Sequence, residues 1–173
     1  MATLSSRMKK YEYVTRTFLT RRSPVIIRID GKAFHSFTRK FQRPFDEILR
    51  QTMVETCKYL CANIMGCKLA YTQSDEISLL LVDYQSLDTE AWFDNNLSKI
   101  ISISASMATL AFNKSFKEIV EISDVENKDI YRKKYDQALF DARAFVLPIE
   151  EVNNYFLWRQ QDASKNSINM VGQ

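Results

Sequence analysis

Three acidic side chains stand out because each lies where an apolar, β-branched run ends or begins. Residues 25–29 read VIIRI and lead directly into Asp30 and Gly31, while Asp75 and Glu76 separate two further strand-like runs. Carboxylates that are brought together repel one another unless a cation lies between them. Mg²⁺ prefers carboxylate and carbonyl oxygens and commonly keeps waters and substrate phosphates as its other ligands. If these acids meet in the fold, the pattern therefore indicates metal-dependent phosphate chemistry.

The order of the elements predicts that they do meet. The strands are expected at 25–29, within 67–84 as a hairpin with Asp75 and Glu76 at its tip, and at 140–147, with long helices between them. This strand, helix, strand, strand, helix, strand order is that of an α+β, ferredoxin-like βαββαβ fold. The right-handed crossover then makes the first and third strands antiparallel neighbours. Asp30 should therefore lie beside the hairpin tip.

The helices are predicted from apolar spacing and from their end signals. A helix within 4–20 is expected to pack on the body, and one from Asp46 to about 64 has Gly66 just beyond its end. Asp88 or Thr89 is predicted to cap the second long helix. Residues 117–138 are expected to form a loop or a short helical insertion, and a last helix follows Pro148.

Each acidic segment taken alone has a simpler interpretation, because Asp-Gly is typical of a turn and a polar hairpin tip of a solvated surface. Other catalytic classes have less support, since the sequence has neither a P-loop nor a GxGxxG pattern and only one histidine, His35. Three cysteines with neither a CxxC pair nor a histidine pair favour free thiols over zinc. Trp92 and Trp158 are expected in the core rather than stacked on bases.

Composition is typical of one compact domain, which we expect to span residues 1–173. The chain is 46% hydrophobic, has a net charge of +3 and contains three cysteines. It has no apolar run of the roughly 18 residues that a membrane span requires. An odd number of cysteines without a secretory segment favours a reducing compartment, so a cytoplasmic protein with no membrane contact is expected.

Six segments together resemble the tRNA-histidine guanylyltransferase superfamily, the 3′-to-5′ polymerases. They read, in order, RIDGKAFHSF, RPFDE, YTQSDEISLLL, LSKI, FDARAF and YFLWRQQD. The stretches HSFTRKFQRPFDE and SDEISLLLVDY are closer in sequence to the bacterial-type branch, the guanylyltransferase-like proteins that repair 5′-truncated tRNA. The resemblance implies a palm domain similar to those of DNA polymerases and nucleotidyl cyclases, which agrees with the ferredoxin-like expectation.

The same resemblance implies roles for individual residues. Asp30, the Gly31 carbonyl and Asp75 would bind two Mg²⁺ ions, and Asp30, Asp75 and Glu76 would be the catalytic acids, with ATP and GTP as substrates. The implied nucleotide-binding residues are Gly31, Lys32, Ala33, Phe34, His35, Arg43, Asp46, Ser74, Asp75 and Lys99. Asp141 and Arg143 match the family's FDGR element, in which Ala142 replaces the glycine.

One departure from the family bears on the reaction. The eukaryotic members carry a His-Ile-Asn-Asn motif after the WRQ-x-D segment, whereas residues 164–167 read SKNS. This favours templated repair of tRNA 5′ ends, after ATP-dependent activation, over the addition of a single G at position −1. A non-catalytic RNA-binding module is the third alternative. The expected partners are tRNA, nucleoside triphosphates and further copies of the chain, as a tetramer by resemblance, and the C-terminal part of the family chain is expected to be missing.

Overall fold

The computed structural model describes residues 2–171, with side chains through Ile168. Its strands are β1 (Val25–Gly31), β2 (Cys67–Gln73), β3 (Glu76–Leu81) and β4 (Phe140–Val146). Its helices are α1 (Leu4–Val14), α2 (Phe34–Phe37), α3 (Glu47–Asn63), α4 (Leu97–Ile122), α5 (Lys128–Arg132) and α6 (Val152–Val171), with 3₁₀ turns η1 (Trp92–Asn95) and η2 (Ile149–Glu151). The sheet order is β2-β3-β1-β4, and every neighbouring pair is antiparallel. The α+β, ferredoxin-like prediction is therefore confirmed.

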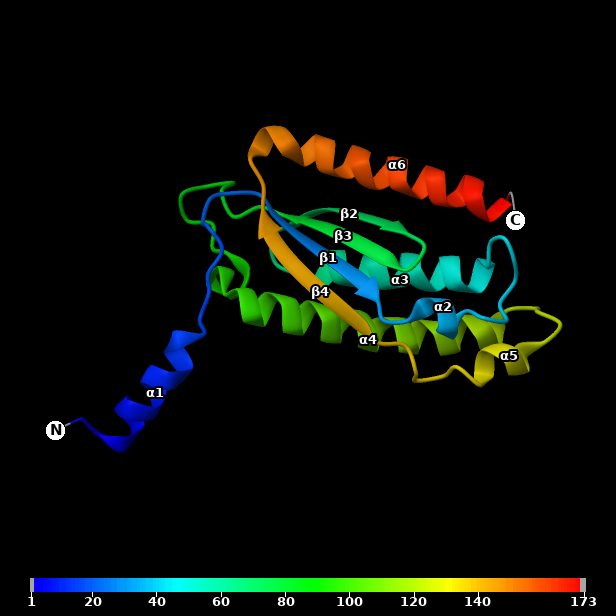
Figure 1. The fold of residues 1–173 in the computed structure, drawn as a ribbon, viewed down its shortest axis with the longest axis horizontal. Coiled ribbons are helices and arrows are strands. Elements are labelled where there is room, and N and C mark those ends of the chain that lie inside the picture. Colours follow the sequence, from blue (N-terminus) through cyan, green and yellow to red (C-terminus); the bar gives the residue numbers. More distant parts are fainter. Residues whose placement is uncertain (1, 172–173) are drawn as a thin grey trace.

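Helices α3 and α4 cover one face of the sheet, and α6 runs across the other (Figure 1). Successive strand residues point to opposite faces, and the central strand shows the result clearly. Ile27 and Ile29 are fully buried in the core with Phe112 of α4. The alternate residues Arg28 and Asp30 lie on the other face. The sheet thus has one apolar face that holds the core and a second face, with the buried Ile26 and the charged Arg28 and Asp30, that α6 covers only in part.

An aromatic cluster anchors the chain segment that follows β1. Phe34 and Phe37 are both buried and stack with ring centroids 5.0 Å apart. Phe37 and Phe41 also contact Phe116 of α4, at centroid distances of 5.6 and 5.9 Å. Since aromatic pairs at such distances add to the free energy of burial, the short helix α2 is fixed directly beside the end of β1.

The N-terminal helix differs from its prediction. Helix α1 ends at Val14, none of its residues is buried, and it projects away from the sheet (Figure 1). Tyr11 and Val14 are 74% and 83% exposed, so the apolar spacing that predicted a helix does not pack on this chain's core. The expected packing role is wrong for the described structure. No helix within residues 2–171 is both long and apolar enough to cross a membrane.

The second long helix begins and ends later than predicted. The side chain of Asn96 accepts a hydrogen bond from the Lys99 amide and caps α4, so the predicted cap at Asp88 or Thr89 is wrong. The helix continues to Ile122 because Ile119 and Val120 are buried. Residues 117–122 are therefore helical, and only the remainder of the predicted 117–138 insertion contains a loop and the short helix α5. The last helix follows Pro148 as predicted, after one 3₁₀ turn.

Candidate active site

The end of β1 and the tip of the β2–β3 hairpin lie side by side. The Gly31 amide donates a hydrogen bond of 3.1 Å to the Asp75 carbonyl oxygen. Asp30 pairs in register with Glu76 on β3 and with Asp141 on β4. The strand order that the sequence predicted therefore brings Asp30 and Asp75 together although they are far apart in the chain.

The pKa of the Asp75 carboxyl group reflects this arrangement. Burial raises the pKa of its carboxyl group above the usual aspartate value, and the neighbouring charges of Asp30 and Glu76 raise it further. The Ser74 hydroxyl donates to Asp75 Oδ1 at 3.1 Å and opposes the shift. Ser74 itself adopts a left-handed backbone conformation with φ of 50° at the hairpin tip. The acids thus repel one another in the metal-free protein.

Burial of the Asp75 carboxylate, together with this repulsion, predicts that Asp75→Asn stabilises the metal-free protein. Because the pKa of Asp75 is raised in the folded state, the unfolded state ionises first as pH increases, so the ionised carboxylate costs stability at neutral pH. We expect a higher Tm for Asp75→Asn at pH 7 in EDTA, and a difference that shrinks towards about pH 4, near the ordinary aspartate pKa. Thermal unfolding followed by circular dichroism measures both. A lower Tm at pH 7 would contradict the raised pKa of Asp75 and the cost of burying its charge.

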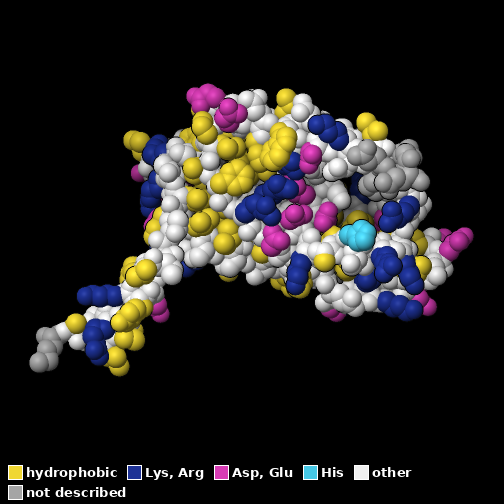
Figure 2. All heavy atoms as spheres, in the orientation of Figure 1, with side chains coloured by type: hydrophobic (Ala, Val, Ile, Leu, Met, Phe, Trp, Pro, Cys, Tyr) yellow, Lys and Arg dark blue, Asp and Glu magenta, His cyan; other side chains and the backbone are white. Residues whose placement is uncertain are grey.

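The donor atoms at this point fit a hard divalent cation. Asp30 and Asp75 supply two carboxylates, and the Gly31 carbonyl can supply a third oxygen. Across the described side chains, no three His, Cys, Asp or Glu groups form a metal cluster, so the candidate set is two carboxylates and one main-chain oxygen. That number suits Mg²⁺, which fills its remaining positions with waters and phosphate oxygens. Acidic side chains gather near the middle of this face, and His35, the only histidine, lies nearby (Figure 2).

Glu76 is held differently from the other two acids. It is buried, and its Oε2 lies 2.7 Å from Arg28 Nη2 and 3.0 Å from Arg159 Nη1. Neither arginine was predicted from the sequence to be a functional residue. The available signal was Arg28 itself, because a charged residue inside an apolar strand needs a buried partner of opposite charge.

The predicted nucleotide loop offers fewer free groups than its sequence suggested. The Lys32 amide donates to the Leu139 carbonyl at 2.8 Å, and the Gly31 amide is likewise already bonded, so neither contributes to an anion-binding nest. Ala33 has a left-handed φ of 55°, and Phe34 points into the core. The side chains of Lys32 and His35 are exposed. Lys32 and His35 are therefore the exposed polar side chains of the predicted nucleotide loop.

Two other predicted nucleotide residues, Arg43 and Lys99, lie on separate segments of the chain. Arg43 is exposed in the loop before α3. Lys99 lies in the first turn of α4, whereas Thr109 of the same helix accepts a hydrogen bond from the Phe140 amide beside Gly31. Ten helical residues span about 15 Å, so Lys99 is not brought to Asp30 within this chain.

Asp46 is engaged in structural hydrogen bonds. Its Oδ1 accepts from the Leu49 amide at 2.8 Å as the cap of α3, and its Oδ2 accepts from the Gln42 amide at 3.0 Å and the Tyr131 hydroxyl at 2.7 Å. The residue is only 9% exposed. Asp46 therefore ties α3 to the preceding loop and to α5.

We expect Asp46→Ala to lower the free energy of unfolding by about 2–4 kcal/mol, because it removes a helix cap and leaves two further donors without their acceptor. Tyr131→Phe removes only one of these bonds and should cost about 1 kcal/mol. Urea unfolding measures both variants. An Asp46→Ala protein of wild-type stability that no longer binds GTP would instead assign the residue to nucleotide binding.

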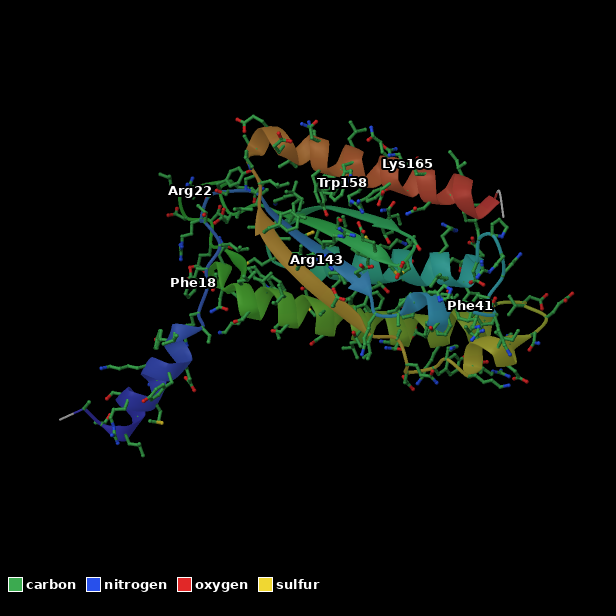
Figure 3. The ribbon with its side chains drawn as sticks, in the orientation of Figure 1. Phe18, Arg22, Phe41, Arg143, Trp158 and Lys165 are labelled. Atoms are coloured by element: carbon green, nitrogen blue, oxygen red, sulfur yellow. The ribbon has the colours of Figure 1, made fainter. Side chains whose placement is uncertain are left out.

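The face of the sheet that carries Asp30 also carries two exposed charged residues of β4, and the exposed Trp158 of α6 lies on the same side. Asp141 and Arg143 of β4 are exposed, with Arg143 Nη2 3.6 Å from Asp141 Oδ1. Arg143 of β4 and Trp158 of α6 lie on the same side of the sheet (Figure 3). Trp158 is 50% exposed. Its predicted core position is therefore wrong, whereas Tyr155 one turn earlier is buried.

Comparison with known proteins identifies the family. A family model described as "Thg1: tRNAHis guanylyltransferase" matches residues 5–148. Two solved structures are titled "Bacterial tRNA(HIS) Guanylyltransferase (Thg1)-Like Protein", one in complex with ATP and one with GTP, and both are 52% identical in sequence. The alignment with the ATP complex has a TM-score of 0.87 and covers 98% of this chain and 69% of the chain in that structure. The GTP complex has a TM-score of 0.89 and covers 99% and 76%.

A curated relative supports the same grouping. The tRNA(His) guanylyltransferase of Debaryomyces hansenii is 32% identical over 166 residues, which cover 92% of this chain and 58% of that protein. The chain thus spans a little over half the length of this curated relative. Since the family model covers most of the chain, the protein belongs to the tRNA(His) guanylyltransferase (Thg1) family.

Proposed function

We propose that this protein is a Mg²⁺-dependent nucleotidyltransferase that adds nucleotides to tRNA 5′ ends in the 3′-to-5′ direction, as templated 5′-end repair. The observation that carries the proposal is the juxtaposition of Asp30 and Asp75, joined by the hydrogen bond from the Gly31 amide to the Asp75 carbonyl. A half-buried, mutually repelling pair of carboxylates beside a main-chain oxygen suits a hard cation that also binds phosphates.

Two transfers make up the proposed reaction. The RNA 5′-monophosphate first attacks the α-phosphate of ATP, which releases pyrophosphate and leaves a 5′-adenylate. The 3′-hydroxyl of the incoming nucleotide then attacks the activated phosphate, and AMP leaves. Bound Mg²⁺ would lower the pKa of the attacking hydroxyl and neutralise charge on the leaving group. Asp30 and Asp75 would hold the ions, Ser74 would orient Asp75, and the exposed Lys32 and His35 would contact phosphates.

The similar proteins support the choice of substrates. The bacterial guanylyltransferase-like protein, at 52% identity, has been solved with ATP and with GTP, and the fungal relative is named for tRNA(His). We propose tRNA and nucleoside triphosphates as partners, a cytoplasmic location and a homo-oligomer, a tetramer by family resemblance. Because the chain spans only part of its curated relatives, its activity on tRNA without further sequence belongs to the proposal.

The test uses a 5′-truncated, 5′-phosphorylated tRNA incubated with the protein, ATP, labelled nucleotides and Mg²⁺. We expect growth at the 5′ end that follows the opposite strand and fills gaps of more than one nucleotide. A single non-templated G at position −1 would instead favour the tRNA(His)-specific reaction. A GTP-and-Mg²⁺ thermal shift separates either enzyme from a non-catalytic RNA-binding module, because a ligand that binds the native state raises Tm. No shift with any nucleotide would contradict the proposal.

A further inference from the structure

A buried cluster of charges joins α6 to the sheet directly beside the candidate metal site. Arg159 of α6 is 2% exposed and Glu76 of β3 is 7% exposed. The Glu76 carboxylate accepts from Arg159 Nη1 at 3.0 Å and pairs with Arg28 Nη2 at 2.7 Å. We call Arg28, Glu76 and Arg159 the Glu76 clamp. Arg159 Nη2 also donates to Asp162 Oδ2 at 3.0 Å, so this guanidinium bonds two carboxylates at once.

Stability alone does not account for the clamp. Moving the charged groups of Glu76 and Arg159 out of water, and that of Arg28 in part, costs free energy, and their attraction offsets that cost only when every donor and acceptor is well paired. Here the Nε atoms of both Arg28 and Arg159 are buried without a hydrogen-bond partner among the described atoms. An apolar cluster of the same size would serve packing at least as well. The geometry of the clamp points to a positioning role.

The clamp also sets the register of α6 on the sheet. One turn before Arg159, the Tyr155 hydroxyl lies 2.8 Å from the Ser78 hydroxyl, and Ser78 is two residues beyond Glu76 on β3. Four helical residues rise about 6 Å, and two strand residues about 6.7 Å, so the two contacts match along helix and strand. The Trp158 ring lies 3.7 Å from the Arg159 guanidinium and covers it. Helix α6 is therefore fixed at the first residue of β3.

That first residue adjoins Asp75. Glu76 follows Asp75 in the chain and pairs in register with Asp30, so holding the Glu76 side chain restrains the turn that carries Asp75. The two guanidinium groups also compensate the charge of Glu76 close to two other carboxylates. At 2% exposure, Arg159 has no surface with which to contact a substrate. Any effect of Arg159 on the reaction must therefore act through Glu76 and the hairpin turn.

We propose that Arg159 is a positioning residue. Together with Arg28 it clamps Glu76, holds Asp75 against Asp30, and keeps Glu76 from ligating metal. This inference deepens the proposed nucleotidyl transfer and rests on it for its functional part. Whether the three side chains are energetically coupled as a clamp can be tested without an activity assay.

The structural arm is a double-mutant cycle on thermal unfolding. We expect E76Q and R159Q each to lower Tm by roughly 10 °C, because removing one partner leaves a buried charge uncompensated. The E76Q/R159Q double variant should melt no lower than the worse single variant, since contacting residues couple. The matched control is the exposed pair Lys117 and Asp136, for which K117Q and D136N should show little loss and no coupling. Additive losses at the clamp would overturn the proposal.

The functional arm uses R159K, which keeps the charge but replaces the two-pronged guanidinium with a single ammonium. We expect kcat to fall about 10- to 100-fold, as when an outer partner of a metal ligand is lost. The KM for the nucleotide should stay unchanged, because Arg159 does not touch the substrate. An unchanged kcat in R159K, with coupling intact, would overturn the positioning role.

Direct metal binding separates the clamp from a ligand role for Glu76. With Mn²⁺ as the probe and electron paramagnetic resonance as the readout, we expect E76Q and R159Q to weaken Mn²⁺ binding to a similar extent, about 10- to 100-fold, while D75N abolishes it. Weaker binding in E76Q together with wild-type binding in R159Q, which keeps the Glu76 carboxylate, would make Glu76 a ligand and overturn the proposal. If the wild-type protein binds no Mn²⁺, the proposed function fails instead, and the unfolding cycle still decides whether the clamp exists.

Discussion

Asp30→Asn is expected to abolish nucleotide addition while leaving the fold intact. The substitution keeps the size of the side chain and removes the charge that a divalent cation needs. Losing an outer partner of a metal ligand commonly costs 10- to 100-fold, so losing a ligand should cost more than about 100-fold. Extension of a 5′-truncated tRNA measures the rate, and far-ultraviolet circular dichroism measures the fold. Asp75→Asn should behave in the same way.

The matched control for this prediction is Asp88→Asn, which removes the same charge from an exposed loop residue. It should leave the rate of extension unchanged. A wild-type rate for Asp30→Asn with Mg²⁺ would contradict the proposed metal site. Because Asp30 also raises the pKa of Asp75, the inactive Asp30→Asn protein should be more stable than the wild-type protein in EDTA. Activity and metal-free stability therefore change in opposite directions, which a simple folding defect would not produce.

The topology was predictable because it depends on patterns that few other arrangements satisfy. The β-branched run at 25–29 and the hairpin at 67–84 define three strands, and the handedness of the crossover then leaves β3 as the neighbour of β1. The pairing of Asp30 with Glu76 follows from that order. What brings the acids together is thus encoded in short-range periodicity and one general rule of chain handedness.

The helix ends were less predictable because several residues could serve as caps. Asp88, Thr89 and Asn96 all belong to the types that cap helices. The chain uses Asn96 because residues 93–95 adopt left-handed φ values of 50° to 58°, which interrupt any helix that starts earlier. A local preference for capping does not reveal such a turn. For α1, apolar spacing predicted the helix correctly but could not show that its apolar side chains remain exposed.

The partners of Glu76 were missed for a different reason. Sequence periodicity places Arg28 on a strand and Arg159 on a helix about 130 residues later, but does not show which buried charges pair. The resemblance grouped Glu76 with the catalytic acids, whereas the structure surrounds its carboxylate with two guanidinium groups. Long-range charge pairing depends on how α6 lies on the sheet, and that is decided by packing rather than by local sequence.

Gly31→Ala is expected to damage both stability and activity through a single contact. A Cβ at Gly31 would lie 2.3 Å from the nearest carbon of the Phe34 ring, far inside van der Waals contact. Phe34 cannot move away, because its ring packs against Phe37, Phe112 and Phe140. Overpacking of this kind costs about 1–3 kcal/mol. The loop from Lys32 to His35 or the end of β1 must shift, and either shift disturbs the hydrogen bond from the Gly31 amide to the Asp75 carbonyl oxygen.

Gly66→Ala is the matched control, because it is also destabilising but lies away from the acids. Gly66 has a φ of +80°, and a Cβ there would lie 3.0 Å from the Val82 carbonyl oxygen, so alanine should lower the free energy of unfolding by a similar amount. Only Gly31→Ala should reduce nucleotide addition at temperatures where both variants are folded. The backbone of Gly31 is not left-handed, so the clash is the only cost of the added methyl group. In a Phe34→Leu background, which removes the ring, Gly31→Ala should therefore cost much less stability. An equal cost in both backgrounds would mean that the main chain, rather than the Phe34 ring, requires glycine at this position.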